Sequence, residues 1–171
     1  MAMKKHIPNI LTLANLFCGM LAIKVGFSEH YYLAGLFVVL GAFFDFFDGF
    51  VARLLKVQGD LGKQLDSFAD MVTFGVVPGV VMYSFLSSFI EDSYIPYISF
   101  VIPLLSAVRL AKFNLDSNQS NKFIGLPTPA NALFFVFIPL VFILESFAWD
   151  STTFVTDMNR DYFSNPFVAQ S

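Results

Sequence analysis

Long apolar runs alternate with short polar links along most of the chain. Five runs approach the roughly 20 residues that a membrane-spanning helix needs, at 8–27, 31–55, 65–88, 95–113 and 128–146. This pattern predicts an all-α fold, a polytopic bundle of transmembrane helices. The first run follows Lys4 and Lys5, as in a signal peptide, but Ile23-Lys24-Val25 lacks a small-residue cleavage pattern. We therefore expect a retained first helix, a membrane domain over 1–147 and a polar tail over 148–171.

Composition supports this prediction. Hydrophobic residues make up 56% of the chain and charged residues only 13%, whereas soluble domains carry about 25% charged residues. The net charge is −3 and there is no long basic run, so we do not expect nucleic-acid binding. Cys18 is the single cysteine, which excludes an intramolecular disulfide.

The basic residues indicate an orientation in the membrane. They precede the first run and flank the second and fourth links, at Lys4, Lys5, Arg53, Lys56, Lys63, Arg109, Lys112 and Lys122. The other two links, 28–30 and 87–94, contain neither Lys nor Arg. By the positive-inside rule, the N-terminus and both basic links face the cytoplasm. Lys24 is the exception, and its long side chain can reach the opposite interface.

Four aspartates lie in the second and third runs. Asp45 and Asp48 are three residues apart and Asp66 and Asp70 are four apart, so each pair shares one helix face. A carboxylate within the bilayer costs about 2.5–3.5 kcal/mol on insertion scales. With a helical rise of 1.5 Å per residue, Asp45 and Asp70 lie about 9 and 12 Å from the cytoplasmic boundary. The pairs therefore converge in a cavity open to the cytoplasm.

Such a cluster of oxygen ligands favours Mg²⁺ or Mn²⁺, and two such ions form the usual clamp for phosphoryl transfer. Gly49 and Ala52 share the face of the first pair and leave room for a ligand, and Arg53 is placed to meet a phosphate. A proton or ion pathway is the competing interpretation. It does not explain why these three residues occur together with Gly62.

The pattern Asp45-x2-Asp48-Gly49-x2-Ala52-Arg53-x8-Gly62-x3-Asp66-x3-Asp70 resembles, without a mismatch, the signature of the CDP-alcohol phosphatidyltransferase family. The resemblance implies that Asp45, Asp48 and Asp66 bind two divalent ions, Mg or Mn. It implies that Asp70 is the general base and also approaches a metal. Gly49, Ala52, Arg53 and Gly62 would line the CDP site. Homodimers are usual in this family.

Three flanking stretches resemble the multi-spanning bacterial phosphatidylserine synthases, at 7–19, 108–114 and 125–130. Two positions depart from that branch, because Lys112 is commonly Arg and Asn131 is commonly small. The branch implies a bacterial cytoplasmic membrane. Asn9 and Thr12, at the start of the first run, could contact the nucleotide or simply begin a helix. Arg109, with Lys112 second, could bind the serine carboxylate or simply anchor the helix end.

The expected reaction is therefore transfer of the phosphatidyl group from CDP-diacylglycerol to L-serine, giving phosphatidylserine and CMP. Two alternatives stay open: another acceptor, glycerol 3-phosphate or an inositol phosphate, or a non-catalytic membrane scaffold. The family core has six membrane helices, against five runs here. We therefore expect a fragment or a replaced tail.

Overall fold

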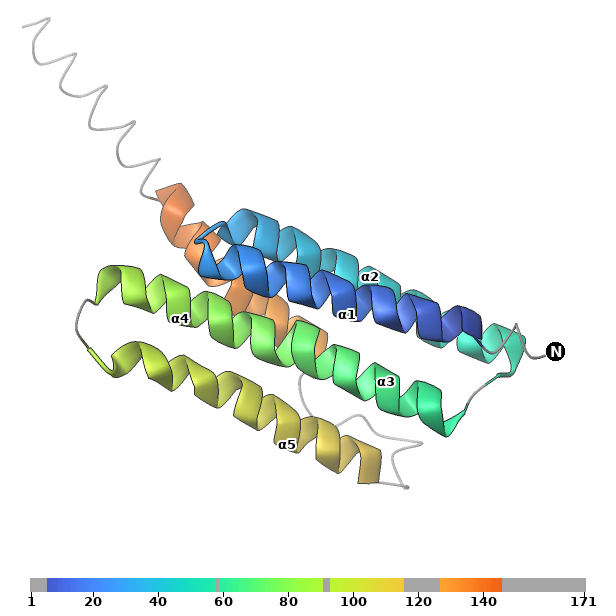
Figure 1. Ribbon diagram of the computed structural model, residues 1–171. Coiled ribbons are helices and arrows are strands. Elements are labelled where there is room, and N and C mark those ends of the chain that lie inside the picture. Colours follow the sequence, from blue (N-terminus) through green and yellow to red (C-terminus); the bar gives the residue numbers. More distant parts are fainter. Residues whose placement is uncertain (1–5, 58, 91–92, 116–126, 146–171) are drawn as a thin grey trace, which may run out of the picture. The chain divides into compact units, whose positions relative to one another are not determined.

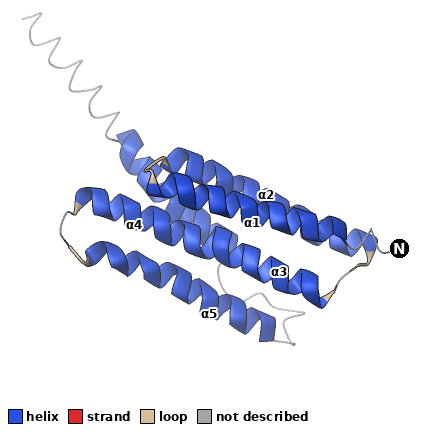
Figure 2. Cartoon of the chain, viewed as in Figure 1, coloured by secondary structure: helices blue, strands red, loops and turns tan. Residues whose placement is uncertain are grey.

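The protein is described by a computed structural model at residues 6–57, 59–90, 93–115 and 127–145. Every regular element in these ranges is helical (Figure 2). The chain divides into two units, Met1–Phe137 and Ile138–Ser171. The elements that build the site belong to the first unit. The polar tail predicted over 148–171 lies outside the described residues.

Two long helices open the first unit and lie side by side (Figure 1). They are α1, His6–Phe27, and α2, Tyr31–Leu55. The residue after α2, Lys56, has left-handed backbone geometry (φ 53°), and its N–H caps the helix on Ala52 and Arg53. This ending lets the chain reverse within a few residues and return as the next helix.

The third run forms a continuous helical segment with a change of pitch inside it. It consists of α3, Asp60–Asp70, a π-helical segment η2, Met71–Val76, and α4, Val77–Phe89. A 3₁₀ segment η3, Ile95–Phe100, then leads into α5, Val101–Leu115. A further helix covers Thr128–Glu145.

By length and composition, five helices of the described chain can cross a membrane, as predicted. The third begins at Asp60, five residues earlier than the apolar run. Its first turn is polar, which an apolar pattern does not detect, and an acidic residue suits a helix N-terminus. Large apolar side chains on these helices are exposed, with Ile10, Phe46 and Leu104 each more than 60% accessible. Because such surfaces need lipid around them, the chain is an integral membrane protein.

Small and polar residues bring α1 into close contact with its neighbours. Its buried positions recur every three or four residues, at Pro8, Thr12, Asn15, Cys18, Gly19, Ala22 and Gly26. A Cβ on Gly19 would lie only 2.5 Å from the Thr73 hydroxyl in η2. Only glycine permits this approach, which is how small residues pack membrane helices.

Candidate active site

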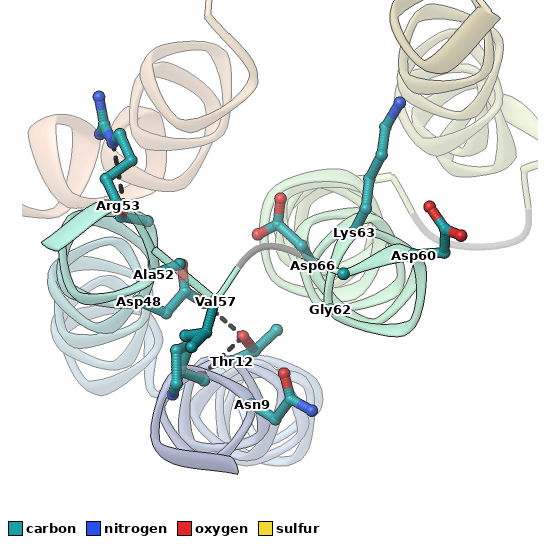
Figure 3. A pocket seen from close by; sticks show the side chains of 13 residues that line it. Asn9, Thr12, Asp48, Ala52, Arg53, Val57, Asp60, Gly62, Lys63 and Asp66 are labelled. Carbon is teal, nitrogen blue, oxygen red and sulfur yellow. Dashed lines mark hydrogen bonds between the residues drawn. The ribbon is translucent and has the colours of Figure 1, made fainter. Parts of the chain in front are cut away.

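A cavity of about 480 Å³ opens where α1 and α3 begin and α2 ends. This volume lies in the range of small-molecule sites. The lining comes from all three helices and from the link between α2 and α3. It consists of Pro8, Asn9, Thr12, Asp48, Gly49, Ala52, Arg53, Val57, Gly59, Asp60, Gly62, Lys63 and Asp66. Figure 3 shows Asp48 and Thr12 facing each other, and Asp66 directed from α3 into the same space.

All six residues predicted for the CDP side line this cavity, namely Asn9, Thr12, Gly49, Ala52, Arg53 and Gly62. The two glycines do different things. A Cβ on Gly49 would meet only the Arg53 guanidinium, at 3.8 Å, so this surface is open. A Cβ on Gly62 would lie 3.3 Å from the Asn9 side-chain oxygen, so Gly62 lets α3 approach α1.

Three of the predicted metal ligands come together. Asp45, Asp48 and Asp66 can each offer a carboxylate oxygen so that these atoms lie within 4.8 Å of one another. Ligand oxygens around Mg²⁺ or Ca²⁺ lie about 2.0–2.6 Å from the ion, so oxygens on opposite sides are about 4–5 Å apart. Asp48 is buried and the other two are half-buried. An oxygen-only donor set of this size fits a hard divalent cation.

Asp70 lies beside this group rather than within it. The Asp45 carboxyl lies close to those of both Asp66 and Asp70. One carboxylate oxygen of Asp70, Oδ1, is buried without a hydrogen-bond partner. A buried carboxylate oxygen requires a cation or a donor. This oxygen therefore also fits a site that receives a positive ligand.

The orientation of Asp48 depends on α1. The Thr12 hydroxyl lies 2.6 Å from Asp48 Oδ2 and 3.1 Å from the Pro8 carbonyl oxygen. A hydroxyl has one proton to donate, and 2.6 Å is typical of a charge-assisted bond to a carboxylate. Thr12, predicted only as a nucleotide contact, thus also holds a predicted metal ligand.

Arg53 is one of the residues that line the cavity. Its Nε donates a hydrogen bond to the Gly49 carbonyl oxygen at 3.0 Å, one turn earlier on α2. This bond ties the guanidinium to the backbone of α2, and Figure 3 shows the side chain directed away from Asp48 and Thr12.

Neither predicted serine-binding residue lines the cavity. The contacts of α5 with α3, η2 and α4 determine how deep Arg109 and Lys112 lie along the bundle. Asn114 donates to Ser67 Oγ at 2.8 Å, and Cβ atoms on Gly75 and Gly79 would touch Ser106 and Pro103. Interpolating between these pairs places half-buried Arg109 opposite Val72, two residues after Asp70, whereas Lys112 is exposed.

The sequence did not predict a hydrogen bond that joins α5 to α3. Lys63 Nζ donates to the Asn114 carbonyl oxygen at 3.4 Å, and Figure 3 shows its side chain directed away from Asp48 and Thr12. Val57, Gly59, Asp60 and Lys63 were not predicted as cavity residues. These four residues lie between the two aspartate pairs in the sequence, and that position could have indicated that they line the cavity.

Comparison with known proteins gives a consistent result. The family model for CDP-alcohol phosphatidyltransferase matches residues 5–157. A Bacillus subtilis (strain 168) protein is 40% identical over 128 residues, which are 72% of this chain and 70% of the relative. Proteins from Helicobacter pylori (strain J99) and Methanocaldococcus jannaschii are 35% and 37% identical over 78% and 76% of this chain. All three are named CDP-diacylglycerol–serine O-phosphatidyltransferase.

The matched region spans 57% and 58% of the Helicobacter pylori and Methanocaldococcus jannaschii proteins. No solved structure matches the chain significantly. The family model covers the helices that form the cavity and bring the aspartates together. The chain belongs to the CDP-alcohol phosphatidyltransferase family.

Proposed function

We propose that the chain transfers the phosphatidyl group of CDP-diacylglycerol to the hydroxyl of L-serine, giving phosphatidylserine and CMP. One observation carries this proposal: six predicted nucleotide-side residues and two of the clustered aspartates line a single cavity. The names of the matching relatives support the donor and the acceptor. The acyl chains would stay in the surrounding lipid while the headgroup enters between α1, α2 and α3.

In this proposal Asp45, Asp48 and Asp66 would hold divalent metal, Mg or Mn, and Asp70 would approach it. When bound, the metal would stabilise charge on the pyrophosphate, which is the main requirement of phosphoryl transfer. Arg53 would meet the nucleotide phosphates from the cavity wall. Gly49 and Ala52 would give the ligand room against α2.

The chemistry is an in-line displacement at the lipid-side phosphorus. Asp70 accepts the proton of the serine hydroxyl, and a bond forms between that oxygen and phosphorus. The phosphorus–oxygen bond to CMP breaks, and CMP leaves with its negative charge. In this proposal Arg109 is the partner of the serine carboxylate, and the packing register of α5 supports it, because Arg109 lies opposite Val72, within one helical turn of Asp70.

We further propose that the N-terminus and the cavity face the cytoplasm of a bacterial inner membrane and that the enzyme is a homodimer. The orientation is supported by Arg53 and Lys63, which line the cavity, and by Lys112 in the last turn of α5, a helix end that Lys63 contacts. The dimer follows from the family resemblance alone.

The test is CMP release from CDP-diacylglycerol by purified protein with Mn²⁺ or Mg²⁺, with and without L-serine. We expect serine-dependent release that EDTA abolishes and that Asp70→Asn lowers by roughly 10²-fold or more, a usual effect for a general base. Glu29→Gln is the matched control, because it makes the same kind of change in the α1–α2 turn, away from the cavity.

Two other outcomes would change the conclusion. Release with glycerol 3-phosphate or an inositol phosphate, and not with serine, would keep the chemistry and replace the acceptor. No release with any acceptor, from protein that is folded and binds Mn²⁺, would contradict the enzymatic proposal.

A further inference from the structure

A fully buried amide beneath the aspartate cluster has no use in the reaction as described so far. Asn15, in the buried stripe of α1, is 0% exposed. Neither its side-chain nitrogen nor its side-chain oxygen has a hydrogen-bond partner. Burying an unpaired amide is costly, and such groups in membrane helices normally bond across the helix interface. A residue that carries this cost calls for a functional explanation.

Its neighbours place Asn15 between the helices that carry Asp45 and Asp70. The Asn15 carbonyl oxygen accepts a hydrogen bond from the Thr73 hydroxyl at 3.1 Å, and Thr73 lies three residues after Asp70. The Asn15 side-chain oxygen lies 2.9 Å from where a Cβ on Gly41 would be, and Gly41 lies one turn before Asp45. Asn15 therefore lies about one helical turn deeper than the aspartates, since a turn rises about 5.4 Å.

The unpaired groups are complementary. Asn15 offers a buried N–H₂ donor, and Asp70 Oδ1 is a buried acceptor without a partner. Asp70 also interacts with Asp45, so whatever orients Asp70 affects two of the four carboxylates. Asn15 does not line the cavity, so contact with the CDP moiety does not account for it.

We propose that Asn15 is a positioning residue: its amide, unpaired in this structure, would donate to the Asp70 carboxylate after a side-chain rotation and so orient Asp70 and Asp45 for divalent-cation binding and proton transfer. The part that concerns proton transfer rests on the proposed function. The part that concerns cation binding does not. The close approach of Gly41 to the Asn15 side-chain oxygen keeps the amide in place.

Asn15→Leu removes the amide, because leucine keeps the branched shape and the number of side-chain heavy atoms but has no polar atoms. Removing unpaired buried polar atoms should leave the melting temperature in EDTA unchanged or higher. Mn²⁺ affinity, measured by electron paramagnetic resonance titration of the purified protein, should fall roughly 10- to 100-fold, as for other groups that orient metal ligands. The turnover number should fall with it, while KM for CDP-diacylglycerol changes by less than about twofold, because the cavity lining is intact.

Gly41→Ala tests the same contact without altering a polar group. Its Cβ would lie 2.9 Å from the Asn15 oxygen and 2.7 Å from Thr73 Cγ2, so the amide must move. We expect it to lower Mn²⁺ affinity as Asn15→Leu does. Gly26→Ala is the control, because its Cβ would crowd only Val81 and Val80, at 3.2 and 3.7 Å, in another part of α1. It should change stability without changing Mn²⁺ affinity.

Wild-type Mn²⁺ affinity and turnover in Asn15→Leu would overturn the proposal. The proposal would also be overturned if Asn15→Leu lost Mn²⁺ affinity only in proportion to a fall in melting temperature and Gly26→Ala lost as much. If Asn15→Leu does not fold, Gly41→Ala decides the question by the same two criteria. If the wild-type protein binds Mn²⁺ in an Asn15-dependent way but releases no CMP with any acceptor, the positioning role stands and the proposed function fails.

Discussion

At the scale of single residues, the site depends on a few contacts between side chains of different helices. Asp48 is 5% exposed, and Thr12 on α1 donates a hydrogen bond to its carboxylate. A buried carboxylate without its donor loses both orientation and solvation. The role of α1 is therefore not limited to contacts with the substrate. It also determines where a carboxylate from α2 points.

The first prediction concerns this hydroxyl. Thr12→Val keeps the shape of the side chain and removes the donor to Asp48. A hydrogen bond to a charged group contributes about 1.5–3 kcal/mol, so Mn²⁺ affinity should fall by roughly 10- to 150-fold. Titration of the purified protein with Mn²⁺ measures this directly. Thr12→Ser, which keeps the hydroxyl, should retain most of the affinity. Equal affinity in the valine and serine variants would contradict the role given to the bond.

The second prediction concerns Gly49, where stability and activity should change in opposite directions. Gly49→Ala adds a methyl group whose nearest neighbour is the Arg53 guanidinium at 3.8 Å, so the fold accommodates it. Alanine in a helix is about 0.5–1 kcal/mol more favourable than glycine, so the melting temperature should rise. The same methyl group narrows the cavity, so KM for CDP-diacylglycerol should increase. An unchanged KM would show that the nucleotide does not lie against this face of α2.

At the scale of elements, the change of helical pitch after Asp70 is the main departure from regular structure. The π-helical segment η2 begins at Met71, directly after α3 ends at Asp70. Its buried residues Thr73 and Gly75 face α1 and α5, which they contact through Asn15 and Ser106. Single π-helical turns often occur at functional sites. Here the turn lets one helix present aspartates to the cavity and small residues to two neighbours.

The third prediction concerns the packing of α5 on α4. A Cβ on Gly79 would lie 2.8 Å from Pro103 Cδ and 3.4 Å from the Ser99 carbonyl oxygen. A proline ring and a carbonyl group cannot move aside as a flexible side chain does, so Gly79→Ala should destabilise the protein by about 1–3 kcal/mol. Thermal unfolding in detergent measures the loss. Gly49→Ala is the matched control with the opposite expected sign. A melting temperature in Gly79→Ala equal to that of the wild type would mean that α5 does not pack on α4 at this point.

Helical periodicity explains which parts of the site could be predicted. Spacings of three and four residues place Asp45 with Asp48 and Asp66 with Asp70, and the family pattern marks the glycines and Arg53. These positions are set within single helices or across one short link. The register of α5 is different, because it depends on contacts such as Gly79 with Pro103 that no periodicity encodes. Predictions for Arg109 and Lys112 were correspondingly weak, and both remain predictions. Asn15 left a signal, a polar residue inside an apolar run, but its neighbours come from α2 and η2.

At the scale of the whole molecule, polar and apolar surfaces are separated along the helices. The polar groups gather at the cavity, where α1 and α3 begin, while exposed large apolar side chains such as Phe17 and Leu36 cover the helix flanks. This separation requires that the cavity end of the bundle meet water and the flanks meet lipid. The basic residues near the cavity then specify which side of the membrane that end faces.

The last prediction tests this orientation by the accessibility of single cysteines. Cys18 is 6% exposed, and its replacement by alanine leaves a background without thiols. Ser28→Cys lies in the α1–α2 turn and Gly59→Cys in the α2–α3 link, and both positions are exposed. A membrane-impermeant maleimide added to intact cells from outside should label the cysteine at position 28 and not that at 59, which should react only after the membrane is opened. The reverse pattern would place the cavity outside, where neither CDP-lipid nor cytoplasmic serine would reach it, and would contradict both the orientation and the proposed reaction.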